Sequence, residues 1–317
     1  MFFCGDRSKR GWLLSSTLLF ITYLDFAVAD PSEYVVGDPA TPVVAVFALP
    51  RDVVQFQTRQ TLGALQTNLG HLEQVADRTW HWTAPDTAGA FGEVQVFTAG
   101  STGLIQRINL FVLVPAQEAD DGYVGEFRVD SYPTEAPAKA AENYAPPVGF
   151  VKVTAENAER RVSSHFRIGQ FISKQAGDWP KYVVPGPQLY SKLESLLELV
   201  RARGHDADTL HVMSGFRTPF YNRSLGNVQF SRHIYGDAAD VFVDVDGDGN
   251  MDDLNGDGLV SVEDAATLGS WMNSLADQAA HVDLAGGLGV YDATRYHGPF
   301  VHIDTRGYRA RWGHLPD

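Results

Sequence analysis

The stretch SRHIYGDAAD, residues 231–240, is the most informative part of this chain. It places His233 and Asp240 seven residues apart, and a second histidine, His302, follows in the segment FVHID of residues 300–304. Two imidazoles and one carboxylate suit zinc, and a catalytic zinc site uses three protein ligands and keeps its fourth position open. Such an ion polarises a carbonyl and makes a nucleophile from water near neutral pH. We therefore predict that His233, Asp240 and His302 bind Zn²⁺.

The same stretch resembles the Ser-x-His-x-x-Gly-x-Ala-x-Asp signature of the D-Ala-D-Ala carboxypeptidase and hedgehog-like group of zinc peptidases, which cut bacterial cell-wall peptides. Upstream, HVMSGFRTPFYN at 211–222 is similar to the Ser-Gly-Tyr-Arg-Thr-Pro-x-x-Asn block of this group. Downstream, residues 286–291, 300–304 and 311–313 resemble the C-terminal block of its murein-endopeptidase-like branch. The resemblance covers roughly residues 162–313. It implies hydrolysis of peptide bonds in peptidoglycan stem peptides or cross-links, by a carboxypeptidase or an endopeptidase.

The resemblance also implies roles for two further side chains. The arginine of the upstream block lies near the substrate carbonyl or carboxylate in this group, so Arg217 is expected to stabilise the developing oxyanion, because a planar guanidinium suits either group. The alternative is that Arg217 only fixes its loop by a salt bridge. Ser231 aligns with a serine that hydrogen-bonds substrate, and its alternative role is that of a turn or cap residue.

The general base is where the sequence departs from the best-known relatives. Carboxypeptidases of the group place a glutamate three residues before the last histidine, and others place a histidine two before it; this chain has Pro299 and Phe300 there. Asp304 follows His302 by two residues and lies on the same face of a regular strand. We expect Asp304 either to accept the proton of the water as the catalytic base or to orient His302. His297 is the second candidate for the base.

Between Asp240 and the last strands lies an acidic insert, residues 244–264. Its second half fits a twelve-residue calcium loop, because glycine at position 6 allows the turn and alternate oxygens converge on one hard cation. We predict a structural Ca²⁺ there, with Asp253, Asn255, Asp257 and Asp264 as ligands. The first half repeats the start of such a loop with Asp244, Asp246, Asp248 and Asp252, and predicts a second, incomplete calcium site. The alternative is a solvated acidic loop without metal.

Hydrophobic periodicity predicts an α+β catalytic domain over residues 161–317. Leucines at helical spacing between 189 and 197 predict a core helix that ends near Gly204, and an apolar stripe from Leu268 to Leu275 predicts a second one. Short alternating runs near residues 210–212, 239–243, 286–291 and 300–304 predict a small antiparallel sheet with the metal on one face.

The N-terminal third contains short apolar runs, at 42–48 and 108–114, that predict strands. Residues 80–96 resemble the Trp-x-Ala-Pro-x-x-x-Gly pattern of bacterial immunoglobulin-like domains, which implies an all-β sandwich over residues 30–130. The prolines between 131 and 160 predict a semi-rigid linker. The partner of the β domain is left open.

Residues 1–29 carry a basic start, an apolar run and AVA before Asp30, which is typical of a cleavable signal peptide. We therefore expect an exported, periplasmic or extracellular protein with no membrane span after cleavage. The net charge of −14 argues against a nucleic-acid partner. The expected partners are peptidoglycan peptides. A different class of function is a non-catalytic protein, stabilised by zinc and calcium, that binds the cell wall or a partner.

Overall fold

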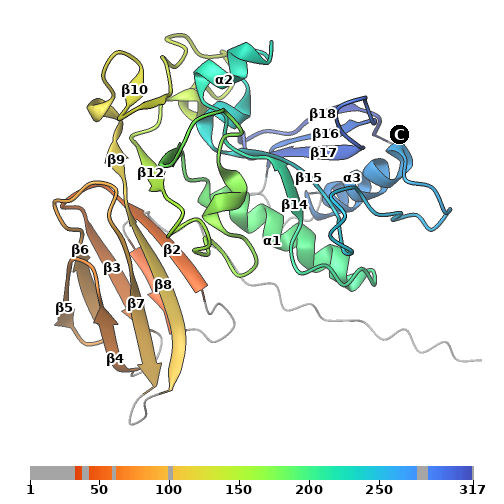
Figure 1. Ribbon diagram of the computed structural model, residues 1–317. Coiled ribbons are helices and arrows are strands. Elements are labelled where there is room, and N and C mark those ends of the chain that lie inside the picture. The colour runs from red at the N-terminus through yellow and green to blue at the C-terminus, as the bar shows by residue number, and fades with distance from the viewer. Residues whose placement is uncertain (1–32, 38–42, 59–61, 99–102, 277–284, 316–317) are drawn as a thin grey trace, which may run out of the picture.

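The computed structural model describes residues 33–37, 43–58, 62–98, 103–276 and 285–315 of the chain. The predicted signal peptide, residues 1–29, lies outside these residues. Within them, no helix has the length and apolar character needed to cross a membrane. The architecture is mixed, with several small sheets and few helices (Figure 1).

Two four-stranded sheets form the N-terminal part, drawn in orange to yellow in Figure 1. One has the order β1 (Glu33–Val36), β3 (Val53–Thr58), β6 (Thr79–Thr83) and β5 (His71–Ala76). The other has the order β2 (Val43–Ala48), β8 (Leu104–Val112), β7 (Phe91–Thr98) and β4 (Leu62–Thr67). Both sheets bury alternate residues in one cluster around Phe56 and Trp82, because successive side chains of a strand point to opposite faces. The immunoglobulin-like character of this part stays a prediction.

A three-stranded sheet joins this part to the rest of the chain. Its order is β13 (Lys181–Val183), β12 (Gly149–Val153) and β9 (Val114–Pro115), and β9 follows directly on β8. The linker predicted over residues 131–160 therefore contains a strand, β12, whose Phe150 and Val153 are buried in the main core. The cluster of prolines suggested an extended spacer, but the apolar run after Pro147 pairs with strands on both sides.

Shorter elements complete this region. The strands β10 (Tyr123–Val124) and β11 (Phe127–Arg128) form a small hairpin. Four 3₁₀ turns occur in the described chain: η1 (Ala116–Glu118), η2 (Ala141–Tyr144), η3 (Ile168–Phe171) and η4 (Arg232–Tyr235).

The C-terminal part is built on a five-stranded sheet. Its order is β14 (His211–Ser214), β15 (Ala238–Phe242), β17 (Phe300–Asp304), β16 (Gly287–Tyr291) and β18 (Ala310–Gly313). The predicted strands are confirmed, but the sheet is not wholly antiparallel, because β18 pairs with β16 in parallel. The sequence reading missed β18, a strand of only four half-buried or exposed residues at the sheet edge.

Helices α1 (Pro187–Ala202) and α3 (Val262–Ala276) cover one face of this sheet, and α2 (Pro219–Ser224) follows β14 (Figure 1). Proline in the first turn of α1 and Gly204 after its end, at φ 96°, fit the predicted limits of this helix. The apolar stripes of α1 and α3 enter the same buried cluster as Val241, Val290 and Ile303 of the sheet. The opposite face of the sheet is thereby left for polar residues.

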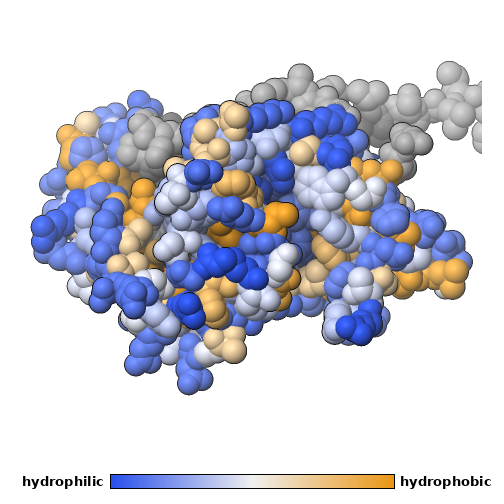
Figure 2. Space-filling view, turned by 90° about the horizontal axis from the view of Figure 1, so that it is seen from above, coloured by the Kyte–Doolittle hydropathy of each residue, from blue (hydrophilic) through white to orange (hydrophobic). Residues whose placement is uncertain are grey.

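The surface seen in Figure 2 is mixed, with small groups of hydrophobic side chains among hydrophilic ones.

Candidate metal centre

One row of paired residues crosses the five-stranded sheet on the face turned away from the helices. Ser214 pairs with Asp240, Asp240 with His302, His302 with Gly289, and Gly289 with Trp312. Their neighbours in sequence, such as Val241 and Val301, point into the core on the other side. The period of two in these strands therefore brings Asp240 and His302 side by side, although 62 positions separate them in the chain.

His233 reaches the same place from the short turn η4 between β14 and β15. Gly236 ends this turn at φ 75°, and a Cβ there would lie 2.4 Å from the carbonyl oxygen of Val184. Only glycine combines this backbone conformation with so close an approach. The glycine of the sequence motif thus turns the chain back so that His233 faces the row on the sheet.

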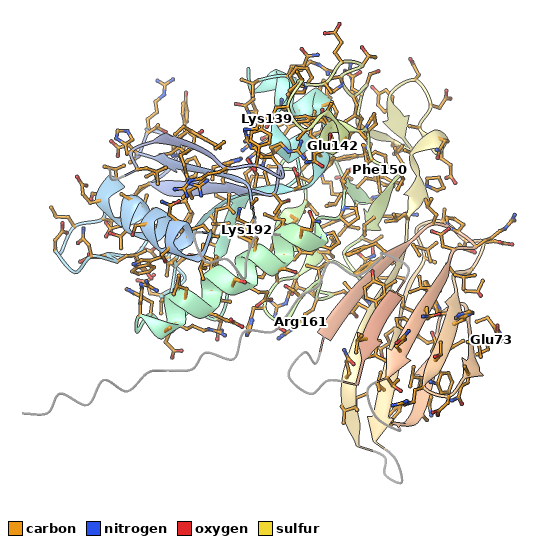
Figure 3. All side chains as sticks on the ribbon, turned by 180° about the vertical axis from the view of Figure 1, so that it is seen from behind. Glu73, Lys139, Glu142, Phe150, Arg161 and Lys192 are labelled. Carbon is orange, nitrogen blue, oxygen red and sulfur yellow. The ribbon has the colours of Figure 1, made fainter. Side chains whose placement is uncertain are left out.

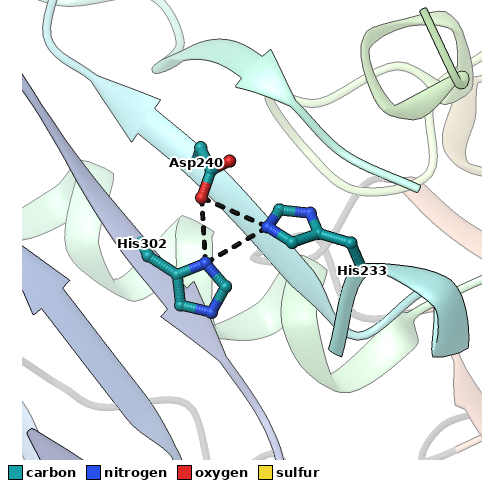
Figure 4. A group of neighbouring side chains, drawn as sticks. All are labelled: His233, Asp240 and His302. Carbon is teal, nitrogen blue, oxygen red and sulfur yellow. Dashed lines mark hydrogen bonds and ion pairs between the residues drawn. The ribbon is translucent and has the colours of Figure 1, made fainter. Parts of the chain in front are cut away.

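The three predicted zinc ligands converge (Figure 4). His233 Nε2 lies 3.2 Å from His302 Nδ1 and 3.2 Å from Asp240 Oδ1, and the last two atoms are 2.9 Å apart. A tetrahedral zinc with ligands at ~2.0–2.1 Å separates its ligand atoms by about 3.3 Å. The three atoms therefore fit a zinc ion after small outward shifts. All three residues are buried, with exposed fractions of 2%, 4% and 7% for His233, Asp240 and His302.

Hydrogen bonds behind the two imidazoles fix which nitrogen faces the centre. His233 Nδ1 lies 2.7 Å from the carbonyl oxygen of Gly215, and His302 Nε2 lies 3.2 Å from Asp304 Oδ2. Both partners are acceptors, so these nitrogens must donate. In neutral imidazoles the lone pairs of His233 Nε2 and His302 Nδ1 then face Asp240 Oδ1. Three lone pairs this close require a cation or a shared proton between them, which is the arrangement of a metal site.

The electrostatics agree with this arrangement. Burial lowers the pKa of His233. Burial opposes ionisation of Asp240, but the two imidazoles hold the pKa of its carboxyl well below the usual range. Burial also lowers the pKa of His302, but its hydrogen bonds to Asp240 and Asp304 raise it to about 9 in the protein without metal. A metal ion must therefore displace a proton from His302 when it binds.

The contacts of Asp304 favour the second of its two expected roles, that of orienting His302, and its role as catalytic base stays an untested prediction. It is fully buried, and it contacts His302 Nε2 while Nδ1 of the same ring faces the metal centre. Its Oδ1 accepts the amide hydrogen of Gly287, and the guanidinium of Arg306 donates to both oxygens. Burial raises the pKa of Asp304, but His302 and Arg306 lower it far more, so the carboxylate is a poor proton acceptor.

A buried lysine that the sequence reading missed lies beneath this pair. Lys192 points from α1 towards the sheet, where its Nζ donates to the main-chain oxygen of Asp304 over 2.7 Å (Figure 3). Its exposed fraction is 2%, and burial lowers its pKa to about 8. In the sequence this lysine stands among leucines, at a position of the helix that the leucine spacing predicts to be buried. A charged residue at a predicted core position was the signal that could have identified it.

Glycines on β16 give room for the residues of the metal face. A Cβ at Gly287 would lie 2.3 Å from Asp304 Oδ2, and a Cβ at Gly289 would lie 2.2 Å from Trp312 Nε1. Trp312 packs against His302 with ring centroids 5.3 Å apart and donates to the Tyr291 hydroxyl over 2.8 Å. The alternating glycines of GGLGVY therefore make space for the indole beside the metal ligand.

Arg217 and Ser231 line the same cavity of about 530 Å³ as the three ligands. Arg217 donates to Asp240 Oδ2 and, over 2.9 Å, to Ser214 Oγ, so it holds the carboxylate with Oδ1 facing the histidines. Ser231 stands at the N-cap of η4, but its side chain caps no amide of that turn. The contact of Arg217 with Asp240 holds this carboxylate in place, and a substrate contact of Arg217 stays a proposal.

His297 also lines this cavity, from the loop between β16 and β17. Its Nδ1 lies 2.8 Å from the carbonyl oxygen of Gly298, and its ring packs edge-on against Phe300 with centroids 5.0 Å apart. Because Nδ1 donates to a carbonyl, Nε2 of a neutral ring carries the lone pair. His297 is therefore a half-buried imidazole among the residues that line the metal cavity, with a nitrogen that can accept.

The acidic insert folds into two turns. In the second, the fully buried Asp264 accepts the amide hydrogens of Leu254, Asn255 and Ser261. Asp253 likewise accepts those of Gly256, Asp257 and Gly258. The calcium site predicted from Asp253, Asn255, Asp257 and Asp264 stays a prediction. In the first turn, carboxylate oxygens of Asp244, Asp246 and Asp248 lie within 4.8 Å of one another.

Residues 165–253 match the family model described as Peptidase M15. The matched part is a little over a quarter of the chain, and it contains α1, β14, η4 and β15, with His233 and Asp240. His302 lies beyond the matched residues, and the sheet register connects it to Asp240. The Peptidase M15 match supports a peptidase, and peptidases of this family depend on zinc. A comparison with curated proteins gives no match.

Proposed function

We propose that this chain is an exported, zinc-dependent peptidase that hydrolyses peptide bonds in peptidoglycan stem peptides or cross-links. The observation that carries the proposal is the convergence of His233 Nε2, Asp240 Oδ1 and His302 Nδ1 at the wall of an open cavity. The Peptidase M15 match over residues 165–253 supports the substrate class.

The three ligands suit a zinc ion in both type and spacing. When bound, zinc polarises the scissile carbonyl and lowers the pKa of water to near neutrality. The protein contributes the orientation of its ligands. Gly215 and Asp304 fix the two imidazoles, and Arg217 fixes Asp240. These side chains are therefore already ordered in the folded protein before substrate binds.

His297 is the side chain that we assign as general base. Asp304 is buried behind His302 and already accepts from Arg306 and Gly287, whereas His297 lines the cavity with Nε2 able to accept a proton. An imidazole nitrogen can accept a proton from water and later return it to the leaving amine. Ser231 and Arg217, on the same cavity wall, are assigned to hydrogen bonds with the substrate.

The aromatic wall of the cavity gives the substrate its second contact. Tyr291 and Phe300 stack with ring centroids 4.7 Å apart, and Trp312 hydrogen-bonds the Tyr291 hydroxyl. Such a wall packs against the apolar part of a peptide while the polar residues opposite bind its main chain. Trimming of a terminal residue and cleavage of a cross-link are both consistent with this cavity.

Export is proposed from the sequence of residues 1–29, and the two N-terminal sheets are proposed to be an immunoglobulin-like domain that spaces the peptidase part or contacts the wall.

The test is mass spectrometry of purified muropeptides and cross-linked dimers after incubation with the mature protein, residues 30–317. We expect wild type to remove a terminal residue or to convert dimers to monomers, and expect His233→Ala and chelator-treated protein to do neither. His71→Ala is the matched control, because that side chain is 74% exposed on β5, in the N-terminal sheets. If zinc-loaded wild type leaves every substrate intact, the proposal fails and a wall-binding role takes its place.

A further inference from the structure

A second cluster of oxygen ligands lies beyond the end of β15, the strand that carries Asp240. One carboxylate oxygen from each of Asp244, Asp246 and Asp248 lies within 4.8 Å of the others. Asp252 returns to the same loop, because its amide donates to the Val243 carbonyl over 2.9 Å and its Oδ2 accepts from the Val245 amide over 2.8 Å. Nine residues thus bring three carboxylates together and hold a fourth, that of Asp252, against the backbone of the same loop.

Asp244 is the unusual member of this cluster. Its side chain is 94% buried, since its exposed fraction is 6%. Its Oδ2 accepts from the Gly249 amide over 3.1 Å and lies 3.3 Å from His211 Nδ1, but its buried Oδ1 has no hydrogen-bond partner among the described residues. A buried carboxylate oxygen without a partner costs folding free energy unless a cation or a water molecule contacts it.

The neighbouring charges add to this cost. One oxygen from each of three carboxylates, those of Asp244, Asp246 and Asp248, lies within 4.8 Å of the others, so their negative charges repel one another. Carboxylates that repel one another in this way are stabilised by a shared divalent cation.

We propose that the loop of residues 244–252 binds one Ca²⁺ through the carboxylates of Asp244, Asp246 and Asp248. Asp252, whose carboxylate lies in the same loop, is the fourth acidic ligand. This inference is independent of the proposed peptidase activity. It also reverses the order expected from sequence, in which the loop of residues 253–264 is the more complete site.

The structure explains that reversal. In the second turn, the carboxylates of Asp253 and Asp264 already accept several backbone amides, which stabilises them without metal. In the first turn, the most buried carboxylate keeps one oxygen without a partner. The loop that the sequence marks as incomplete therefore has the greater need for a cation.

Calcium fits better than zinc or magnesium. The cluster offers oxygen ligands only, whereas zinc in proteins is bound mostly by nitrogen and sulfur. Calcium accepts six to eight oxygens in variable geometry and can add main-chain carbonyls and water, whereas magnesium demands a regular octahedron. A turn with glycines at positions 247 and 249, both at positive φ, supplies such an irregular cradle.

The site would hold the end of β15 in place. His211 stacks on Phe242, the last residue of β15, with ring centroids 4.3 Å apart. On the other side of the loop, Met251 and Leu254 are buried in the main core. Bound calcium would therefore join the end of the strand that carries a zinc ligand to the core residues Met251 and Leu254.

The test measures metal content and thermal stability of the full mature protein. Zinc-loaded wild type is dialysed against 1 mM CaCl₂ or 1 mM MgCl₂, and metals are counted by mass spectrometry. We expect about one calcium per chain, and a melting temperature that rises with calcium because the ion binds only folded protein. Asp246→Asn, at an exposed position that should not impair folding, should weaken calcium binding at least tenfold, and Asp244→Asn should weaken it further.

Asp257→Asn is the matched control, because it makes the same change at an exposed aspartate of the second turn. It should leave calcium content and its effect on melting unchanged. Absence of bound calcium in wild type, equal retention of magnesium, or loss of calcium in Asp257→Asn but not in Asp246→Asn would each overturn the inference. Zinc content, measured in the same samples, distinguishes this failure from a failure of the peptidase site.

Discussion

The substitutions Asp304→Asn and His297→Gln separate two roles that the sequence could not separate. The structure places Asp304 behind His302, in contact with its ring, and His297 among the residues that line the cavity, where we propose that it accepts a proton. A positioning residue acts through metal affinity, and a general base acts through the rate of reaction. The two variants are therefore expected to change different quantities.

For Asp304→Asn, partners behind a metal ligand typically contribute 10–100-fold in metal affinity, which is about 1.4–2.7 kcal/mol. The loss should lie at the upper end, because the variant also leaves Arg306 without its carboxylate partner. Breaking so buried a pair should lower the free energy of unfolding by roughly 3 kcal/mol as well. For His297→Gln, loss of a general base should lower kcat about 10²–10⁴-fold, with zinc affinity unchanged.

Zinc affinity is measured by competition with a chromogenic chelator, and kcat is measured with muropeptide substrate at saturating zinc. Thermal melting checks that each variant is folded. A folded Asp304→Asn protein should recover most of its kcat when zinc saturates it, and His297→Gln should not. The reverse pattern, with zinc affinity intact and kcat lost in Asp304→Asn, would refute the assignment of Asp304 as a positioning residue.

Three further outcomes follow from the same contacts. Because the pKa of His302 is about 9 without metal, zinc binding at pH 6.5 should release about one proton, measured by calorimetry in buffers of different ionisation enthalpy; no release would show a neutral ring. Gly289→Ala should destabilise the fold by roughly 1 kcal/mol, because a Cβ there would lie 2.2 Å from the indole nitrogen of Trp312. The displaced indole should shift its fluorescence to the red. Unchanged melting and emission would contradict this close packing. Burial lowers the pKa of Lys192 from 10.5 to about 8. Between these pH values the unfolded chain therefore binds more protons than the folded protein. The free energy of unfolding of wild type should rise by roughly 3 kcal/mol between pH 8 and 10.5. The stability of Lys192→Met, measured by chemical denaturation, should not show that gain. The same pH dependence in both proteins would contradict a lowered pKa for Lys192.

Much of the metal centre could be predicted from sequence because its residues obey local rules. The alternation of Val241 and Val301 with Asp240 and His302 predicts which side chains share a face, and the spacing of leucines predicts α1. The sequence motif around Gly236 predicts His233 as the third ligand, beside Asp240 and His302.

What could not be predicted depends on contacts between distant segments. The position of Asp304 relative to the metal face is ambiguous in sequence, because the same strand position suits a base and an orienting partner. Arg306 and Gly287 decide the matter by donating to its carboxylate, while Lys192 donates to its main-chain oxygen, and the three come from different parts of the chain. The pairing of β18 with β16 is long-range in the same sense, since four weakly apolar residues carry no strand signal of their own.

The acidic insert shows a different limit. Sequence spacing ranks a loop by the ligands it could offer, and on that basis residues 253–264 are the better calcium loop. The structure adds which of these oxygens already accept hydrogen bonds. Asp264 is occupied by three amides, and Asp244 keeps a buried oxygen without a partner, which no spacing rule can reveal.

The most direct test of the central claim is a zinc titration of metal-free mature protein, with hydrolysis of purified muropeptides and cross-linked dimers followed by mass spectrometry. The account predicts that activity rises in proportion to added zinc and levels off at about one ion per chain, and that His233→Ala stays inactive throughout. Full activity of the metal-free protein, or a chain that binds one zinc at these ligands and still leaves every substrate intact, would contradict it.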